Sequence, residues 1–222
     1  MGHHSSCSQT LPLTRCASSG FWNHELFVRQ RSQLVNALRG HLAEYGVDVA
    51  QAVVQFRRMI ASFDEVAVDL PAQIGSLWQA YIDQIAFFDE RTGALDHEIK
   101  GQAKTDEATS RLMTVPKVGP MCATTVQAFA PPMEEFSNGR EFAAYCQLVP
   151  RQKSTGGGQI LGRTSKIGQL DIRRLLITGA MAVICWAIRK GPPSGSSRAK
   201  MLARKPRMLV ATALANRLAR NV

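Results

Sequence analysis

A repeat of apolar residues that follows Pro71 constrains the fold more than any other feature of this sequence. Its members succeed one another at alternating steps of four and three residues, and only Thr92 interrupts the series. They are Ile74, Trp78, Tyr81, Ile85, Phe88, Leu95 and Ile99. This spacing predicts a long helix with one apolar seam, in which Trp78 and Phe88 are core residues rather than platforms for stacking bases.

The seam needs a partner, and the segment from His24 to Tyr45 is the first candidate. Its apolar residues also recur at helical spacing, and Gly46 supplies a stop. Two arrangements satisfy the pattern. One is a coiled-coil arm that packs on the first helix or on a second subunit, and the other is a plain antiparallel helical hairpin. A weaker helical stretch is predicted at 53–60.

The rest of the chain is also predicted to be helical, so the expected fold class is all-α. Helical patterns lie at 121–129, 139–146, 170–189 and 206–219, and no convincing strand pattern appears. Residues 1–23 contain no acid and no periodicity, which predicts a disordered lead-in. The arm is assigned to 24–110 and a further domain to 111–222, with residues 191–197 as a connector and Pro206 as the first residue of the last helix.

Positive charge is concentrated at one end of the chain. Residues 1–150 hold twelve Lys and Arg against sixteen Asp and Glu, whereas residues 151–222 hold fifteen against Asp171 alone. Such an excess predicts a polyanionic partner, most economically nucleic acid held through its phosphates. A merely solvated basic face is the alternative.

The five cysteines are widely spaced and form no CxxC pair. They are expected to be free thiols in a reducing cytoplasm. Neither a secretory leader nor an uninterrupted run of about 20 apolar residues is present, so no membrane association is predicted.

The stretch LMTVPKVGPMCATTV at 112–126 has the pattern of two helices joined by a glycine turn. It resembles a helix-hairpin-helix, in which the turn directs backbone N–H groups of a helix start at a phosphate. Pro120 removes one N–H group, and Lys117 adds a charge. The remaining donors are the N–H groups of Gly119, Met121 and Cys122. An ordinary packing corner between two helices is the alternative.

A Ser-Thr pair stands directly before three glycines in LVPRQKSTGGGQILGRTSKIG at 148–168. Gly156, Gly157 and the glycine that follows allow the backbone to approach a ligand closely. The cationic donors of this stretch, which has no carboxylate, are Arg151, Lys153, Arg163 and Lys166. An anionic ligand is therefore predicted. The hydroxyls of Ser154 and Thr155 are either a nucleophile toward phosphorus or phosphate ligands, and spacing alone does not separate these roles.

Two adjacent arginines, Arg173 and Arg174, open an otherwise apolar helical stretch. They are expected to lie at the edge of a packed core with a fixed orientation. Four further residues are expected to extend this basic surface, although individual members can be simple solvated charges. They are Lys205, Arg207, Arg217 and Arg220.

The order of these motifs resembles the insertion-sequence transposases of the 110/116/902 group, also called DEDD or bridge-RNA-guided recombinases. The resemblance rests on VRQRSQLVNALRGHLAEYG at 28–46, TVPKVGPMCATTVQAF at 114–129 and FAAYCQLVPRQKSTGGGQILGRTSKIGQLDIRRLLITGA at 142–180. It implies an N-terminal RuvC-like domain with four acidic metal ligands, a coiled-coil arm, and a helical transposase domain that carries a serine nucleophile. The implied activity is DNA transposition and recombination directed by a structured guide RNA.

By this resemblance the nucleophile position falls on Thr155, with Ser154 beside it. The extra methyl group of a threonine restricts its χ1 angle and crowds an in-line attack, so Ser154 is the second candidate. Two-metal chemistry needs several carboxylates, and residues 1–23 contain none. The acids of the arm, Asp83, Asp89 and Asp96, are expected to face solvent.

The chain is therefore expected to be the C-terminal portion of a transposase without its RuvC-like domain, and not active alone. It is expected to bind no metal itself, with Mg²⁺ present only together with the acidic domain. The expected partners are DNA, a guide RNA and, through the arm, a second copy or a full-length relative in a bacterial cytoplasm. The rival interpretations are a DNA- or RNA-binding module without chemistry and an unexpressed remnant.

Overall fold

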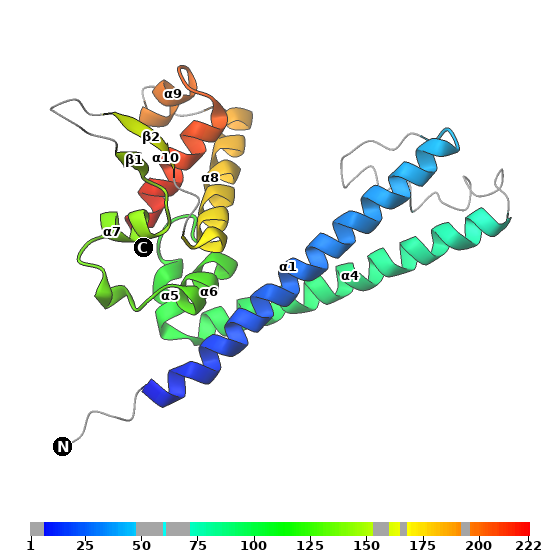
Figure 1. Ribbon diagram of the computed structural model, residues 1–222, viewed down its shortest axis with the longest axis horizontal. Helices are drawn as coiled ribbons and strands as arrows, with labels where there is room; N and C mark the ends of the chain where they lie inside the picture. Colours follow the sequence, from blue (N-terminus) through cyan, green and yellow to red (C-terminus); the bar gives the residue numbers. More distant parts are fainter. Residues whose placement is uncertain (1–6, 48–59, 61–71, 153–159, 165–167, 192–195) are drawn as a thin grey trace. The chain divides into compact units, whose positions relative to one another are not determined.

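The computed structural model describes residues 7–47, 60, 72–152, 160–164, 168–191 and 196–222 (Figure 1). This part of the chain is almost entirely helical, which confirms the all-α class. The chain forms two compact units, Trp22–Glu98 and Met1–Phe21 together with Ile99–Val222. We call the first the arm unit and the second the C-terminal unit.

The arm unit is an antiparallel pair made from parts of two long helices, α1 (Cys7–Glu44) and α4 (Ala72–Thr105). Its buried core joins both helices, and its members are Leu38, Leu42, Trp78 and Ile85. The pairing runs in opposite directions along the two helices, because His24 lies against Asp96 whereas His41 lies against Tyr81. The apolar seam is therefore covered within the chain, as in the helical hairpin; a coiled coil with a second subunit stays a prediction.

The two aromatic residues assigned to the arm core are confirmed as packing residues. Trp78 is fully buried, and its ring meets the Tyr45 ring edge to face at 5.7 Å between centroids. Phe88 is half-buried against Phe27, also at 5.7 Å. Thr92, which interrupts the seam, is buried too, and its hydroxyl has no hydrogen-bond partner. The seam thus tolerates one polar position at a cost in stability.

Helix α1 begins at Cys7, so the expectation of a disordered lead-in over 1–23 is wrong for its described part. A long-range contact supplies the reason. Phe21 is buried, and its ring packs edge to face on Phe129 at 5.6 Å between centroids. Composition alone gives no sign of such a contact. The weaker helix expected at 53–60 lies outside the described residues, except for Ile60, which is helical.

The carboxylates of the arm do not all face solvent as expected. Asp89 receives a hydrogen bond from Arg31, and Asp96 lies 3.2 Å from His24, so both are paired across the two helices. Asp83 is exposed. The antiparallel register decides this, because it places basic side chains of α1 opposite these positions of α4.

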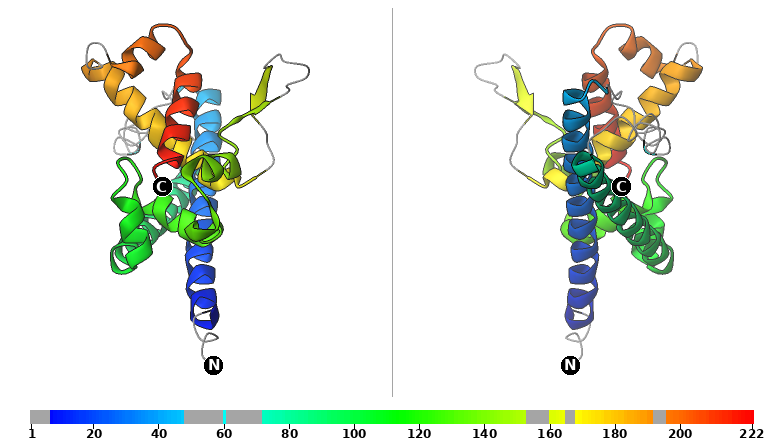
Figure 2. Two further views of the ribbon diagram at one scale, coloured as in Figure 1. Left: turned by 90° about the vertical axis from the view of Figure 1, so that its left-hand side faces the viewer. Right: turned by 90° about the vertical axis from the view of Figure 1, so that its right-hand side faces the viewer.

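The C-terminal unit consists of short helices around a central pair, α8 (Leu170–Lys190) and α10 (Arg207–Ala219) (Figures 1 and 2). The other elements are α5 (Glu107–Met113), α6 (Pro120–Phe129), the 3-10 helix η1 (Met133–Glu135), α7 (Gly139–Tyr145), β1 (Pro150–Gln152), β2 (Leu161–Thr164) and α9 (Ser197–Leu202). Helix α8 buries residues at helical spacing, including Ile172, Leu176 and Ala180, and α10 presents the small Ala211 and Ala215. Small residues allow the two helices to pack closely.

Four predicted helices agree with the structure to within one residue, but the short elements α5, η1, β1, β2 and α9 were missed. Helices α5 and α9 are only 7 and 6 residues long, too short for a clear period. The antiparallel strands β1 and β2 are also short, and they pair Pro150 with Thr164 and Gln152 with Leu161 across an irregular register. Pro206 is the N-cap of α10 rather than its first residue, and Ser196 caps α9 through the Ala199 N–H.

Candidate nucleic-acid interface

The turn between α5 and α6, residues 114–119, presents the start of a helix without a side-chain cap. We call it the hairpin turn. Gly119 is the N-cap residue and Pro120 follows in the first turn. The first backbone N–H groups of any helix lack an acceptor within that helix, so those of Met121 and Cys122 are available to an outside acceptor. Gly119 is exposed, as the predicted phosphate contact requires.

Lys117, at the tip of this turn, has an unusual backbone. Its φ angle is 78°, in the left-handed region that favours glycine, and its side chain is exposed. Val118 is buried beside it and anchors the turn to the core, with its N–H bonded to the Val115 carbonyl at 3.1 Å. The turn therefore holds a lysine in a conformation that costs about 1–2 kcal/mol relative to ordinary backbone. A bend of this kind cannot be read from residue types.

The strands β1 and β2 lead into and out of the Ser-Thr-glycine segment and extend from the helical body of the unit (Figure 2). Ser154, Thr155, Lys153, Gly156, Gly157 and Lys166 lie outside the described residues. Arg163 lies within β2, and Arg151 lies on β1 with an exposed side chain. The structure thus brings the two ends of the segment together.

The base of this strand pair is fixed to the helical core. Leu148 is buried, and its carbonyl accepts a hydrogen bond from the Asn216 side chain of α10 at 3.2 Å. Gly168 has a φ angle of 135°, and a Cβ atom there would lie 2.5 Å from Gln147 Cγ and 3.0 Å from the Tyr145 carbonyl oxygen. Only glycine fits this position, so the return of the chain into α8 is set against α7.

Exposed basic residues follow the strand pair along α8, α9 and α10. Arg173, at the start of α8, is half-buried beside the core residue Ile172, and Arg174 is exposed. This agrees with the expected place at the edge of the core. The other exposed basic residues of these helices and their ends are Arg189, Lys190, Lys200, Arg204, Lys205, Arg207, Arg217 and Arg220. We call this set, with Arg174, the basic face, as a name for these residues together and not for one side of the unit.

Sequence reasoning overlooked one side chain near the basic face. Trp186 of α8 is 57% exposed, and the Lys190 ammonium lies over its ring at 5.5 Å from the centroid. A tryptophan three and four residues before two basic residues on an expected helix was the available signal. The apolar residues on both sides of the tryptophan hid that signal.

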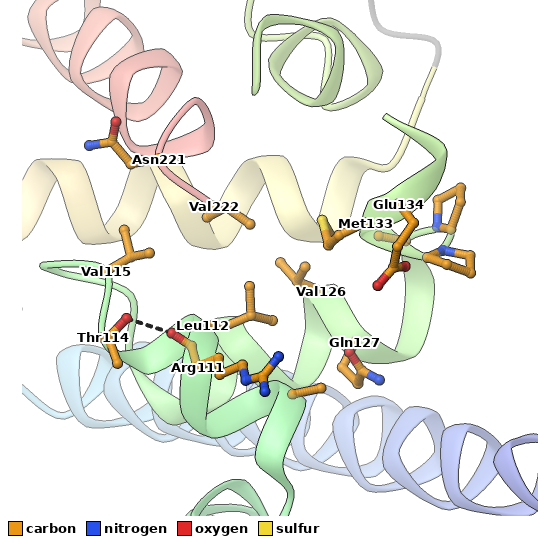
Figure 3. Close-up of a pocket in the computed structure, with 14 residues that line it drawn as sticks. Arg111, Leu112, Thr114, Val115, Val126, Gln127, Met133, Glu134, Asn221 and Val222 are labelled. Atoms are coloured by element: carbon orange, nitrogen blue, oxygen red, sulfur yellow. Dashed lines mark hydrogen bonds between the residues drawn. The ribbon is translucent and has the colours of Figure 1, made fainter. Parts of the chain in front are cut away.

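A cleft of about 720 Å³ lies between α5, α6, η1 and the last residues of the chain (Figure 3). Its lining is mostly apolar and includes Leu112, Val126 and Met133. Arg111 and Glu134 contribute the charged groups. The lining gathers no cluster of basic or nucleophilic groups, so it does not belong to the phosphate-binding chemistry.

The buried thiols of this unit are inert. Burial raises the pKa of Cys122 to about 12 and, with the neighbouring Cys122, that of Cys146 to about 12. Both stay protonated at neutral pH and do not act as nucleophiles. The expected free thiols are confirmed for these two residues and for the exposed Cys185.

The described residues do not fit a two-metal site. They contain no cluster of three or more His, Cys, Asp or Glu side chains suited to holding a metal. Two acids of the arm are paired with basic side chains instead, Asp89 with Arg31 and Asp96 with His24. None of the described helices is both long and apolar enough to cross a membrane.

Comparison with known proteins defines the class of this chain. It is 36% identical over 197 residues to a "Probable family 20 transposase" of Pseudomonas aeruginosa, covering 87% of this chain and 58% of that protein. It is 32% identical over 158 residues to the "Transposase for insertion sequence element IS1111A" of Coxiella burnetii, covering 71% and 43%. The chain is therefore similar over most of its length to transposases, one of them named for an insertion sequence element.

The particular family follows from the C-terminal unit. Residues 109–192 match the model described as the transposase IS116/IS110/IS902 family, so this part of the chain carries a domain of that family. The matched range runs from α5 to the end of α8 and so includes the hairpin turn and both strands. The chain spans about half the length of the curated relatives it matches, from 43% to 58%.

Proposed function

We propose that the C-terminal unit binds DNA through the sugar-phosphate backbone and serves in the DNA strand exchange of a transposase. The basic face carries this proposal, because α8, α9 and α10 expose many Lys and Arg residues and contain no acid besides Asp171. Phosphate contacts from such a surface release counterions and provide affinity without reading base sequence. A structured guide RNA offers the same phosphates and is included in the proposal.

The hairpin turn supplies a further phosphate contact in this proposal. The N–H groups at the start of α6 point away from their own helix, and the exposed Lys117 adds a full charge next to them. A left-handed backbone conformation is less favourable for lysine than for glycine. The presence of a charged side chain at this strained position supports a role in binding.

We expect DNA binding by this chain to weaken steeply with salt, and Lys117→Gly to reduce the steepness. Several phosphate contacts give a negative slope of log K against log [salt], and loss of one contact lowers its magnitude by about 1. Glycine suits the left-handed backbone at 117, so the variant should fold at least as well as the parent. Fluorescence anisotropy with a labelled duplex, measured at several salt concentrations, gives the slope.

Lys100→Gln is the matched control for this measurement. Lys100 is an exposed lysine of α4 outside the proposed interface, so its removal should leave the slope unchanged. A slope near zero for the parent chain would refute DNA binding through phosphates. If the parent and Lys117→Gly gave equal slopes, Lys117 would make no phosphate contact. The hairpin turn would then not belong to the interface, and the rest of the proposal would stand.

We further propose that the hydroxyl of Thr155 or Ser154 attacks a DNA phosphorus. The hydroxyl oxygen forms the new bond to phosphorus and the bond from phosphorus to O3′ breaks, which leaves a 5′-phospho link to the protein. The hydroxyl proton ends on the leaving O3′, so a free 3′-hydroxyl is produced. Arg151 of β1, near the start of the segment, is suited to stabilising negative charge on the phosphoryl oxygens.

Loss of both hydroxyls should abolish covalent attachment to DNA. With a nicked suicide substrate, a guide RNA and a full-length relative present, this chain is expected to give an adduct that survives denaturing electrophoresis. Ser154→Ala combined with Thr155→Ala should lower the adduct yield at least about a thousandfold, because no nucleophile remains. The two single variants identify the attacking residue.

The rival proposal is a binding module without chemistry that modulates full-length relatives through the arm. Salt-dependent DNA binding together with no adduct from the parent chain, even with the relative and Mg²⁺ added, would favour it. We assign no step to Mg²⁺, since the described residues do not fit a two-metal site. We propose instead that any Mg²⁺ comes with an acidic domain supplied by another protein or by another part of the transposase.

A further inference from the structure

We propose that Trp186 of α8 is a stacking platform for an unpaired base of a bound nucleic-acid strand. This inference rests on the proposed DNA binding and adds a contact of a different kind to it. Aromatic side chains next to a cationic surface bind single strands, because every base has a flat face that stacks and every nucleotide carries a phosphate.

The exposure of Trp186 is the first supporting observation. More than half of its side chain is accessible to solvent, although the nearby residues Val183, Ile184 and Ala187 of α8 are buried. The ring therefore contributes little to the packing of the unit. One exposed apolar residue by itself needs no explanation, so its surroundings must carry the argument.

The charge around the ring is the second observation. The Lys190 ammonium lies over the ring at 5.5 Å from its centroid, and Arg189 is exposed one residue before it. A cation in this position is attracted by the electrons of the ring and holds a charge beside it. A base stacked on the ring would thus have its own phosphate within reach of a cation.

Continuity with the hairpin turn is the third observation. A Cβ atom on Gly179 would lie 3.3 Å from the Lys117 carbonyl oxygen, so the turn packs directly on α8 at Gly179. Trp186 follows Gly179 by seven residues, which is nearly two helical turns, so the two positions share one flank of α8 about 10 Å apart along its axis. The proposed phosphate contact and the exposed ring therefore lie along one side of one helix.

Together these observations favour a strand whose phosphate meets the hairpin turn and whose unpaired base reaches Trp186. A duplex keeps its bases stacked on one another, so it would use the phosphate contacts only. DNA and RNA bases offer the same flat face, and the shared chemistry is therefore an unpaired base of either polymer.

The test compares Trp186→Ala and Trp186→Phe with the parent chain. We expect Trp186→Ala to weaken binding of a single-stranded DNA oligonucleotide about tenfold and to leave binding of the matching duplex within about twofold. Trp186→Phe should restore most of the single-strand affinity because it keeps an aromatic ring. The slope against salt should stay unchanged in both variants, since the ring makes no ionic contact.

Trp22→Ala is the matched control, because Trp22 is 51% exposed but belongs to the arm unit. It should change neither affinity. The same measurements are made with an RNA oligonucleotide of the same sequence. The polymer, DNA or RNA, whose affinity falls more in Trp186→Ala is the one whose base stacks on the ring. Quenching of parent fluorescence by the single strand, lost in Trp186→Ala, would support stacking directly.

Three outcomes would overturn the inference. Unchanged single-strand affinity in Trp186→Ala, with salt-dependent duplex binding intact, refutes the stacking role and leaves the proposed function standing. Unchanged nucleic-acid affinity with an altered oligomeric state in sedimentation assigns the ring to a protein contact instead. Failure of the parent chain to bind any oligonucleotide at low salt refutes the proposed function and this inference together.

Discussion

Replacing Trp78 with alanine should lower the free energy of unfolding of the arm unit by about 3–5 kcal/mol, the largest effect expected from one substitution in this chain. Trp78 is fully buried between α1 and α4, in one core with Leu38, Leu42 and Ile85. Removal of the indole leaves a cavity that a helix pair with one narrow seam cannot refill. Urea denaturation followed by far-UV circular dichroism measures the loss without relying on tryptophan emission.

Trp186→Ala is the control for that measurement, since it makes the same chemical change at an exposed position. Surface substitutions usually alter stability by no more than about 0.5 kcal/mol. The assignment of Trp78 to the arm core fails if the two variants lose similar amounts of stability. The same control shows that any binding defect of Trp186→Ala is not a folding defect.

The second large effect is expected from Gly139→Ala at the start of α7. A Cβ atom on Gly139 would lie 2.2 Å from the backbone carbonyl oxygen of Arg220 and 2.8 Å from its carbonyl carbon. Backbone atoms cannot rotate away as a side chain can, so α7 or the end of α10 must move. We expect a loss of about 3 kcal/mol in the stability of the C-terminal unit. Hydrogen exchange of the α10 amides would locate the damage.

Gly101→Ala provides the matched comparison. Gly101 lies within α4 in the same unit, and a Cβ atom there would meet nothing within 4 Å. An open position in a helix interior should gain about 0.5–1 kcal/mol from alanine. If Gly139→Ala proved as harmless as this control, the close approach of α7 and α10 would be wrong. The proposed DNA binding by the basic face should weaken in Gly139→Ala only to the extent that α10 moves.

Much of the fold was predictable because it depends on local pattern. The seam of α4 and the core face of α8 follow from apolar residues at helical spacing, and both helices are found where that spacing placed them. The basic character of the C-terminal unit follows from composition alone. The resemblance in sequence motifs likewise identified the family that the comparisons support.

The candidate site was less predictable, since its features depend on contacts between distant residues. Arg173 at the edge of the core followed from its place before buried residues. The positive φ of Lys117 and the strand pair around the Ser-Thr-glycine segment carry no clear residue signature. Trp186 carried no prediction because its neighbours in sequence are apolar, whereas its own side chain is exposed on α8.

The sequence by itself determined that this chain is helical, that one long seam must be covered, and that its last third is strongly basic. Helix period and charge are properties of short stretches, so residue order contains them directly. Only the tertiary structure decided that α1 covers the seam and that α1 begins as early as Cys7. It also decided that residue 139 must lack a Cβ atom, because the Arg220 backbone lies against it. These features arise where segments far apart in the chain meet, and the physical reason is close packing, which depends on which surfaces come together and not on any one stretch.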